Sequence, residues 1–180
     1  MLYGCASSAR IEQMAVPLEQ STSLKFDAKL KNAIDVSDVA GGSETNPLWT
    51  SEIGNAEFSG ALQESLRRVQ LLGVDDKAKF ELTAKLISVD QPVLGMDFKV
   101  TTKVRYSLKA KKTGKVVYEK EITADHTATM GDAFYGVERL RLANEGSAQK
   151  NIEQFLKALA KLKISKKDVS MLPSTEKRLM

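Results

Sequence analysis

The chain has 180 residues, of which 42% are hydrophobic and 28% are charged, and its formal net charge is +4. This length and hydrophobic content support one domain with one core. The modest basic excess, without aromatic residues interleaved among the Lys and Arg residues, argues against a nucleic-acid binder. A single cysteine excludes an intramolecular disulfide and a cysteine-based metal cluster, and no apolar run reaches the ~18 residues of a membrane span.

The only cysteine belongs to a short motif near the start of the chain. Leu2-Tyr3-Gly4-Cys5 resembles the lipobox that ends a bacterial lipoprotein signal peptide, where the cysteine becomes the first mature residue and carries the lipid. Because Met1 directly precedes this tetrad, we expect that the signal sequence has been removed, or else that the match is a coincidence. Residues 1–23 lack sustained periodicity and contain Pro17, so we interpret them as a lipobox remnant and a flexible tether.

The folded domain is expected at residues 24–165, and its first half contains a strand and a helix. Alternating apolar residues predict one strand within 26–39, followed by a loop rich in Gly and Asn-Pro. A stripe at helical spacing comes next and consists of Phe58, Ala61, Leu62, Leu66 and Val69. This stripe predicts a helix over roughly 56–72, capped by Asn55 and ended by Gly73.

Three strands follow the first helix, and the last two form a hairpin. The first of the three is expected from 80 to about 92, where a proline ends the pattern. Long alternation over 98–110 and again over 116–128, with a Lys-Thr-Gly turn between them, predicts the hairpin. Its register should place Arg105 opposite Glu121, so that the outer face pairs basic with acidic residues.

A second helix is predicted at about 137–162, with Gly146 inside it at a cost of ~1 kcal/mol relative to alanine. Residues 166–180 are expected to form a basic tail. The order β-α-β-β-β-α predicts an α+β fold. We expect a two-layer sandwich in which an antiparallel sheet of about four strands carries two amphipathic helices on one face.

Few residues offer catalytic or metal-binding chemistry. His126, the only histidine, lies among the apolar positions of the return strand, which favours a structural role over a catalytic base or a pH switch. One histidine and one cysteine far apart in sequence argue against a His/Cys metal site. We therefore expect no enzyme activity, no metal and no cofactor. Carboxylates such as Asp125, Asp132 and Glu145 keep an enzyme as an alternative.

Two features are candidate partner-binding sites. Arg139, Arg141 and Glu145 lie in a charged stretch of the second helix, where ion pairs can form locally. They form either a structural network or a docking face that exploits the close approach allowed by Gly146. Trp49, the only tryptophan, follows a loop proline and is either a core residue or an interface anchor.

Together these features resemble a family of uncharacterised Gram-negative outer-membrane lipoproteins over about residues 24–162. The layout is similar to that of LptE-like and ABC-transport-auxiliary lipoproteins. The resemblance rests on the Cys5 tetrad, Asn46-Pro47-Leu48-Trp49, the 58–72 helix, Thr113-Gly114-Lys115 and the stretch from Glu138 to Gly146. It implies a lipid on Cys5, and Ala6 after the cysteine is similar to lipoproteins sent to the outer membrane. It transfers no catalytic residue.

We therefore expect a periplasm-facing, lipid-anchored outer-membrane lipoprotein with a non-catalytic binding or assembly role in the cell envelope. Its partner would be an envelope protein or a lipid, and the sequence leaves its oligomeric state open. One alternative is a carrier of a hydrophobic ligand or lipid between the helices and the sheet, which requires a lined cavity. The other is an envelope enzyme that uses the carboxylates named above.

Overall fold

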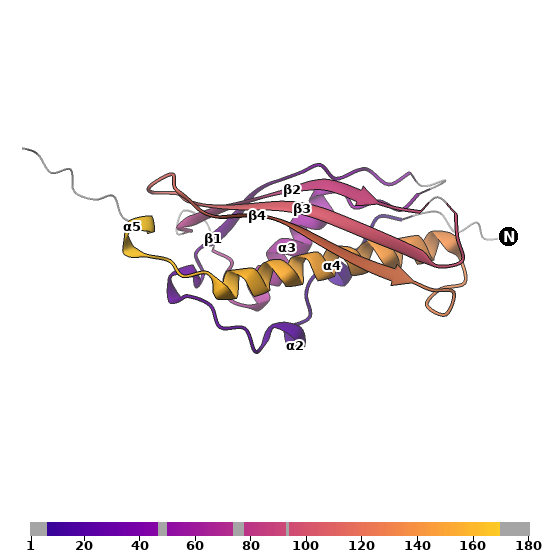
Figure 1. Ribbon diagram of the computed structural model, residues 1–180, viewed down its shortest axis with the longest axis horizontal. Helices are drawn as coiled ribbons and strands as arrows, with labels where there is room; N and C mark the ends of the chain where they lie inside the picture. The colour runs from indigo at the N-terminus through magenta and orange to yellow at the C-terminus, as the bar shows by residue number, and fades with distance from the viewer. Residues whose placement is uncertain (1–6, 47–49, 74–77, 93, 170–180) are drawn as a thin grey trace, which may run out of the picture.

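An open sheet with two long helices on one face forms the body of the protein (Figure 1). The computed structural model describes residues 7–46, 50–73, 78–92 and 94–169. In chain order the elements are α1 (Ile11–Met14), α2 (Leu18–Ser21), a 3-10 turn (Ala28–Leu30), β1 (Ile34–Ala40), α3 (Asn55–Arg68), β2 (Phe80–Asp90), β3 (Phe98–Ala110), β4 (Val116–Ala128), α4 (Gly136–Lys161) and α5 (Lys166–Val169).

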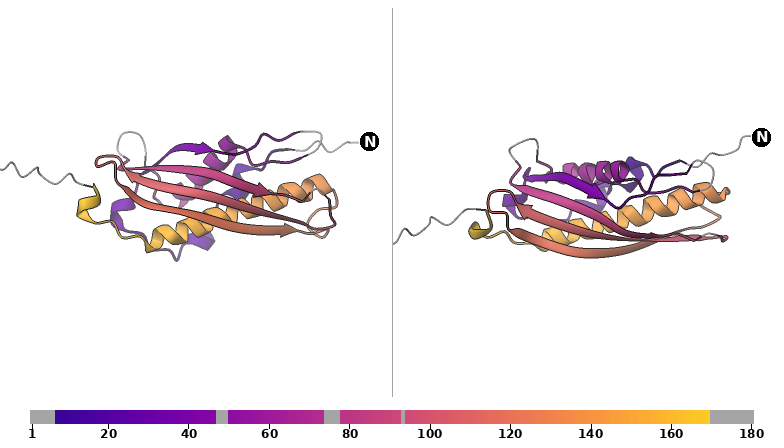
Figure 2. Two further views of the ribbon diagram at one scale, coloured as in Figure 1. Left: turned by 45° about the horizontal axis from the view of Figure 1, so that its top comes forward. Right: turned by 90° about the horizontal axis from the view of Figure 1, so that it is seen from above.

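The four strands lie in the order β1-β2-β3-β4, and both helices α3 and α4 lie on the same side of them (Figure 2). This confirms the predicted two-layer α+β fold. The expectation of a purely antiparallel sheet is wrong, because β1 pairs with β2 in parallel. The reason is that α3 connects these two strands, and a helical crossover returns the chain so that adjacent strands run in the same direction.

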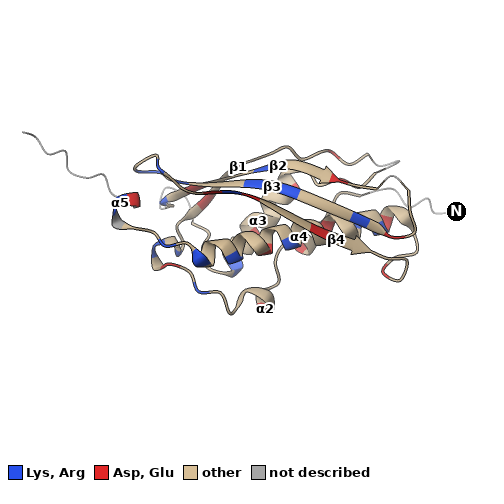
Figure 3. Ribbon diagram, in the orientation of Figure 1, with Lys and Arg blue, Asp and Glu red and all other residues tan. Residues whose placement is uncertain are grey.

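The hairpin of β3 and β4 has the bounds and the register that alternation predicts. Arg105 pairs with Glu121 across the two strands, and their side chains form a 2.5 Å ion pair. Lys99 and Asp125 form a second pair on the same outer face, at 3.5 Å. The outer face of the sheet therefore carries opposite charges side by side (Figure 3).

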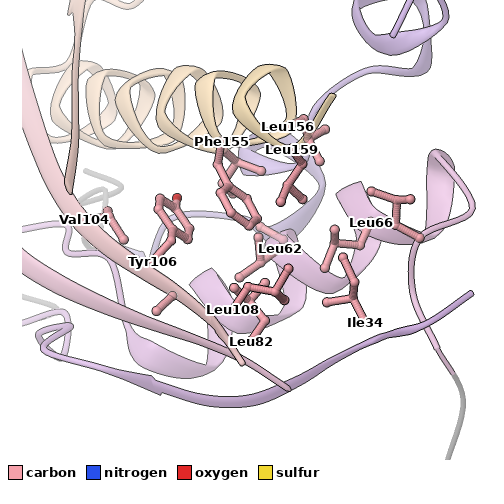
Figure 4. Close-up of a cluster of buried hydrophobic side chains, with 14 of the residues drawn as sticks. Ile34, Leu62, Leu66, Leu82, Val104, Tyr106, Leu108, Phe155, Leu156 and Leu159 are labelled. Carbon is pink, nitrogen blue, oxygen red and sulfur yellow. The ribbon is translucent and has the colours of Figure 1, made fainter. Parts of the chain in front are cut away.

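Aromatic and aliphatic side chains fill the space between the sheet and the helices (Figure 4). Tyr106 of β3 stacks on Phe155 of α4, with ring centroids 4.2 Å apart and planes within 6°. The wholly buried large side chains around them include Phe58, Phe80, Met14, Leu30, Ile34, Ile53, Leu62, Leu66, Leu71 and Leu82. In the part of the chain that the structure describes, this layer is a packed core rather than the lined cavity that a ligand carrier would need there.

One buried amide joins α4 to the polar groups of β3 and β4 within this core. Asn151 of α4 donates from Nδ2 to the carbonyl of Ile122 at 2.9 Å and to that of Thr102 at 3.1 Å. Its Oδ1 accepts from the hydroxyl of Tyr106 at 2.9 Å. Burial raises the pKa of Tyr106 well above its ordinary value, so its hydroxyl stays protonated as a donor. The network fixes α4 against β3 and β4 because each group would be costly to leave unpaired.

The segment before residue 24 packs on the domain, so the prediction of a flexible tether is wrong for residues 7–23. Met14 and Ala15 are wholly buried, and Val16 is only 1% exposed. The amide of Val16 donates to Ser65 Oγ of α3 at 3.0 Å, and Arg68 donates to the carbonyl of Val16 at 2.9 Å. This short apolar cluster escapes detection because it is too brief to show a helical or strand period.

The predicted ends of the first helix also need correction. Gly54 is the N-cap of α3, whereas the Asn55 side chain accepts a hydrogen bond from the amide of Gly42 at 2.7 Å. The helix ends before Gln70, which has a φ of +58°, and not at Gly73. Polar residues can take this left-handed conformation, so the chain turns three residues earlier than the glycine indicates.

The start of the expected basic tail is folded. Lys166–Val169 forms α5, and the carbonyl of Asp168 accepts from Thr113 Oγ1 of the hairpin turn at 2.9 Å. The carboxylate of Asp168 pairs with Lys115 at 2.5 Å. The chain after α4 therefore returns to the hairpin turn, and the tail beyond residue 169 lies outside the described residues.

Candidate functional site

Two loops meet at one end of the sheet, where β2 ends, β3 begins, β4 ends and α4 begins. Phe98 pairs with Ala128, which places the loop at 91–97 beside the loop at 129–135. The start of the described N-terminal segment is bound beside this end, because Ser51 donates to the carbonyl of Ser7 and itself accepts from Gln91 of the first loop. We call this region the apolar end and define it by these two loops.

Large apolar side chains are exposed on the two loops. Of the nine large hydrophobic residues that are exposed in the described part of the chain, five belong to these loops: Leu94 (88% exposed), Met96 (72%), Met130 (44%), Phe134 (76%) and Tyr135 (69%). Their charged neighbours within the loops are Asp97 and Asp132, and the described loop residues contain no Lys or Arg. Gathered apolar side chains of this kind mark interaction sites, whereas single scattered ones do not.

A cleft of about 610 Å³ opens between these loops and the start of α4. Its described lining is mostly apolar and consists of Thr50, Gln91, Pro92, Leu94, Phe98, Gly136, Val137 and Leu140. Phe98 and Leu140 are almost buried, at 9% and 6% exposure, whereas Leu94 stands open beside them. Volume and lining both match those of pockets for small apolar ligands.

Arg139, a predicted partner-binding residue, points into the protein and holds the second loop. It is 6% exposed, and its Nη1 donates to the carbonyls of Ala133 at 2.8 Å and Phe134 at 2.7 Å. Its guanidinium lies 5.3 Å from the ring centroid of Phe98. Arg139 therefore fixes the backbone that presents Phe134 to solvent.

Glu145 and Arg141 are the other two predicted partner-binding residues of the helix, and both form hydrogen bonds with the N-terminal segment. Glu145 is 2% exposed and accepts from Arg10 Nε at 2.9 Å and Nη2 at 3.1 Å. This hydrogen bonding raises the pKa of the Arg10 guanidinium. Arg141 lies 3.7 Å from Glu145 and donates to Ser7 Oγ at 2.7 Å. The two helix residues thus bind the chain's own N-terminal segment.

A second set of hydrogen bonds joins the same segment to the loops. Ser51 donates from Oγ to the carbonyl of Ser7 at 2.7 Å and accepts at its own carbonyl from Asn144 Nδ2 at 2.8 Å. Gln91 Nε2 donates to Asn144 Oδ1 at 3.0 Å. Burial raises the pKa of the neighbouring Glu52 carboxyl, which also accepts from Gln91. These amides cannot be recognised from the sequence, because isolated Asn and Gln residues form no periodic pattern.

A smaller cleft of about 240 Å³ opens to the surface beside β4 and α4, outside the packed core around Tyr106 and Phe155. His126, Asp132 and Glu145 all line it, whereas Asp125 faces the opposite side of the sheet. Burial and then the charge of Lys150 lower the pKa of His126, so the ring is neutral near pH 7. His126 pairs with Val100 of β3 across the hairpin.

No protein-family model and no curated protein matches this sequence. Solved structures do share its fold. A candidate lipoprotein from Caulobacter crescentus has 15% identity and a TM-score of 0.50, over 72% of this chain and 89% of that one. A Xanthomonas campestris protein of the family DUF330 has 8% identity and a TM-score of 0.55, over 77% and 92%. A PelC dodecamer from Paraburkholderia phytofirmans has 17% identity and a TM-score of 0.51, over 77% and 94%.

These likenesses establish the fold and leave the chemistry to be argued from the residues. Among the described residues, no three His, Cys, Asp or Glu side chains are placed to hold a metal ion. No helix in that part of the chain is long and apolar enough to cross a membrane. The predicted sites at Cys5 and Trp49 lie outside the described residues. What the described part offers is an apolar surface and a cleft, both beside the N-terminal segment.

Proposed function

We propose that this chain is a lipid-anchored outer-membrane lipoprotein that faces the periplasm and has a non-catalytic binding or assembly role. The binding of Ser7 beside the apolar end carries the proposal: Ser7 accepts from Ser51 and Arg141, and Gln91 of the first loop donates to the carbonyl of Ser51. Cys5 precedes Ser7 by two residues, and two residues reach at most about 7 Å. A lipid on Cys5 would therefore hold the apolar end against the membrane. The fold shared with the Caulobacter candidate lipoprotein supports this role.

An assembly role draws support from the sheet. Its outer face carries the alternating charges shown in Figure 3, a surface suited to polar contact with another protein. The strand β4 lies at the border of the sheet, and β3 is its only strand partner in the described chain. An unpaired edge of this length is a template for pairing with another chain. The PelC structure of the same fold is a dodecamer.

Radiolabelled palmitate tests the anchor. The protein, expressed from its full gene in its own Gram-negative host, should incorporate the label, because the lipobox cysteine is the acceptor of the lipid. A Cys5→Ala variant should incorporate none, and density-gradient fractionation should find the labelled protein in the outer membrane.

A Ser7→Ala variant serves as the control for damage near the cysteine, and it should be labelled like the wild type. Equal labelling of the wild type and Cys5→Ala would remove Cys5 as the anchor. Labelled protein in the inner-membrane fraction would overturn the proposed location.

The apolar cleft favours a second candidate function, the carriage of a hydrophobic ligand. Because the space between helices and sheet is packed, the ligand would lie in the cleft at the apolar end. Native mass spectrometry after gentle extraction should then detect a co-purifying lipid. Val137→Trp fills the cleft and should remove the lipid, whereas Ile87→Trp on β2 should not. Repeated absence of a lipid from the wild type would count against carriage.

A further inference from the structure

The apolar end exposes large apolar side chains, and a lipid anchor on Cys5 does not by itself explain why they are exposed. We propose that its two loops insert into the interface of a phospholipid bilayer, with Leu94, Met96, Phe134 and Tyr135 as the inserted side chains. The orientation of the domain rests on the proposed function, because it follows from the place of Cys5. The contact itself does not, because it needs no lipid on the protein.

The exposed fractions of these side chains carry the proposal. Leu94, Met96 and Phe134 each leave more than two thirds of their surface in water, where apolar surface is disfavoured. Transfer of such side chains into lipid is favourable, and the phenol of Tyr135 suits the headgroup level. Tyr135 contacts Phe134 edge-on, with ring centroids 5.6 Å apart. The two aromatic rings therefore form one projecting unit.

The loop that bears these rings is held in place by its own hydrogen bonds. Asp132 accepts from the amide of Thr129 at 2.7 Å and from its hydroxyl at 2.8 Å. Arg139 holds the carbonyls of Ala133 and Phe134 from below. The apolar residues are thus presented outward by a built turn, and insertion requires little ordering of the loop.

Charge decides which bilayer fits. Apart from Asp97 and Asp132, the described residues of the two loops are uncharged. A surface that binds anionic lipids needs clustered Lys or Arg, and these loops offer none in their described part. We therefore commit to a zwitterionic bilayer, bound through apolar contact. The N-terminal segment supports this occupant over a protein, because Ser7, two residues after the proposed lipid attachment at Cys5, is bound beside the apolar end.

The test uses the full chain with Cys5→Ser, so that no lipid anchor contributes. The protein should co-sediment with vesicles of phosphatidylethanolamine and phosphatidylcholine, and raised salt should not release it. Leu94→Ser with Phe134→Ser should lower the partition coefficient by about tenfold or more. The matched control replaces Leu18 and Val116 by serine, because these residues are 49% and 48% exposed but lie outside the apolar end. It should bind like the parent.

A second readout reports insertion directly. A polarity-sensitive fluorophore on Met96→Cys, in the Cys5→Ser chain, should shift to shorter wavelength when vesicles are added. The same fluorophore on Val116→Cys should not shift. Since both positions are exposed, neither label disturbs the core.

Several outcomes would overturn the proposal. One is equal vesicle binding by the loop variant and the control. Another is binding only to anionic vesicles. A third is a parent protein that self-associates but binds no vesicles, together with a loop variant that no longer self-associates. That result would assign the surface to a second copy of the chain. Palmitate labelling of a loop variant that keeps Cys5 is independent of all three. Failure of insertion and failure of the anchor are therefore distinguishable.

Discussion

Gly146 lies in the middle of α4, where glycine costs ~1 kcal/mol relative to alanine. His126 explains its presence, because a Cβ at position 146 would overlap Cδ2 and Cγ of the imidazole ring. Gly146→Ala should therefore lower the free energy of unfolding by about 1–3 kcal/mol, the usual cost of overpacking, despite the better helix propensity of alanine. Urea denaturation followed by circular dichroism measures this change.

The control removes the ring that causes the clash. In a His126→Ala background, Gly146→Ala should be neutral or should raise the free energy of unfolding by up to ~1 kcal/mol. If Gly146→Ala destabilised both backgrounds equally, contact with His126 would not be the reason for the glycine.

The residues that the sequence indicates as partner-binding sites are charged, whereas the surface that the structure exposes for binding is apolar. Arg139, Arg141 and Glu145 stand out in the sequence as a dense group of charges, and the structure shows them bound to the protein's own backbone and N-terminal segment. Phe134 does not stand out, because one aromatic residue in a loop has no period. Its significance comes from exposure beside Leu94, which depends on two loops meeting in space.

At the scale of elements, the sequence predicts the parts with long periods. Thirteen alternating residues in β3 and thirteen in β4 predict the bounds and the register correctly, because a one-residue slip would reverse every side chain. The helix α4 was predicted within a residue at each end for the same reason. Elements with short periods were missed. Met14 enters the core from a four-residue helix, which is barely one helical turn and too short to show a repeat.

The direction of β1 could be argued only from its connection. The strand has only seven residues and contains a bulge, and buried and exposed residues do not alternate regularly along it. The order strand, helix, strand contains the answer, because adjacent strands joined by a helix run in parallel. The alternation within β2, β3 and β4 is typical of an antiparallel sheet, and it gives no information about the direction of β1.

At the scale of the whole molecule, the apolar end and the hairpin turn lie at opposite ends of the long axis, and the N-terminal segment runs from beside the apolar end toward the middle of α4 (Figure 2). The segment is bound to α4 through Glu145 and Arg141, so an anchor at Cys5 would have little freedom to reorient the domain. Insertion of the two loops adds a second contact at the same end. Two contacts at one end would stand the sheet upright on the membrane, with the hairpin turn pointing away.

This orientation predicts a distance that fluorescence energy transfer can measure. Lipidation consumes the thiol of Cys5, so the lipidated protein can carry a single donor dye on Lys112→Cys of the hairpin turn or on Met96→Cys of the apolar end. Thirteen residues at about 3.3 Å each separate the two by roughly 43 Å. With acceptor dyes on the lipid headgroups, transfer should be efficient from position 96 and weak from position 112. A domain lying flat on the bilayer would give similar transfer from both, because its long axis would then be parallel to the surface.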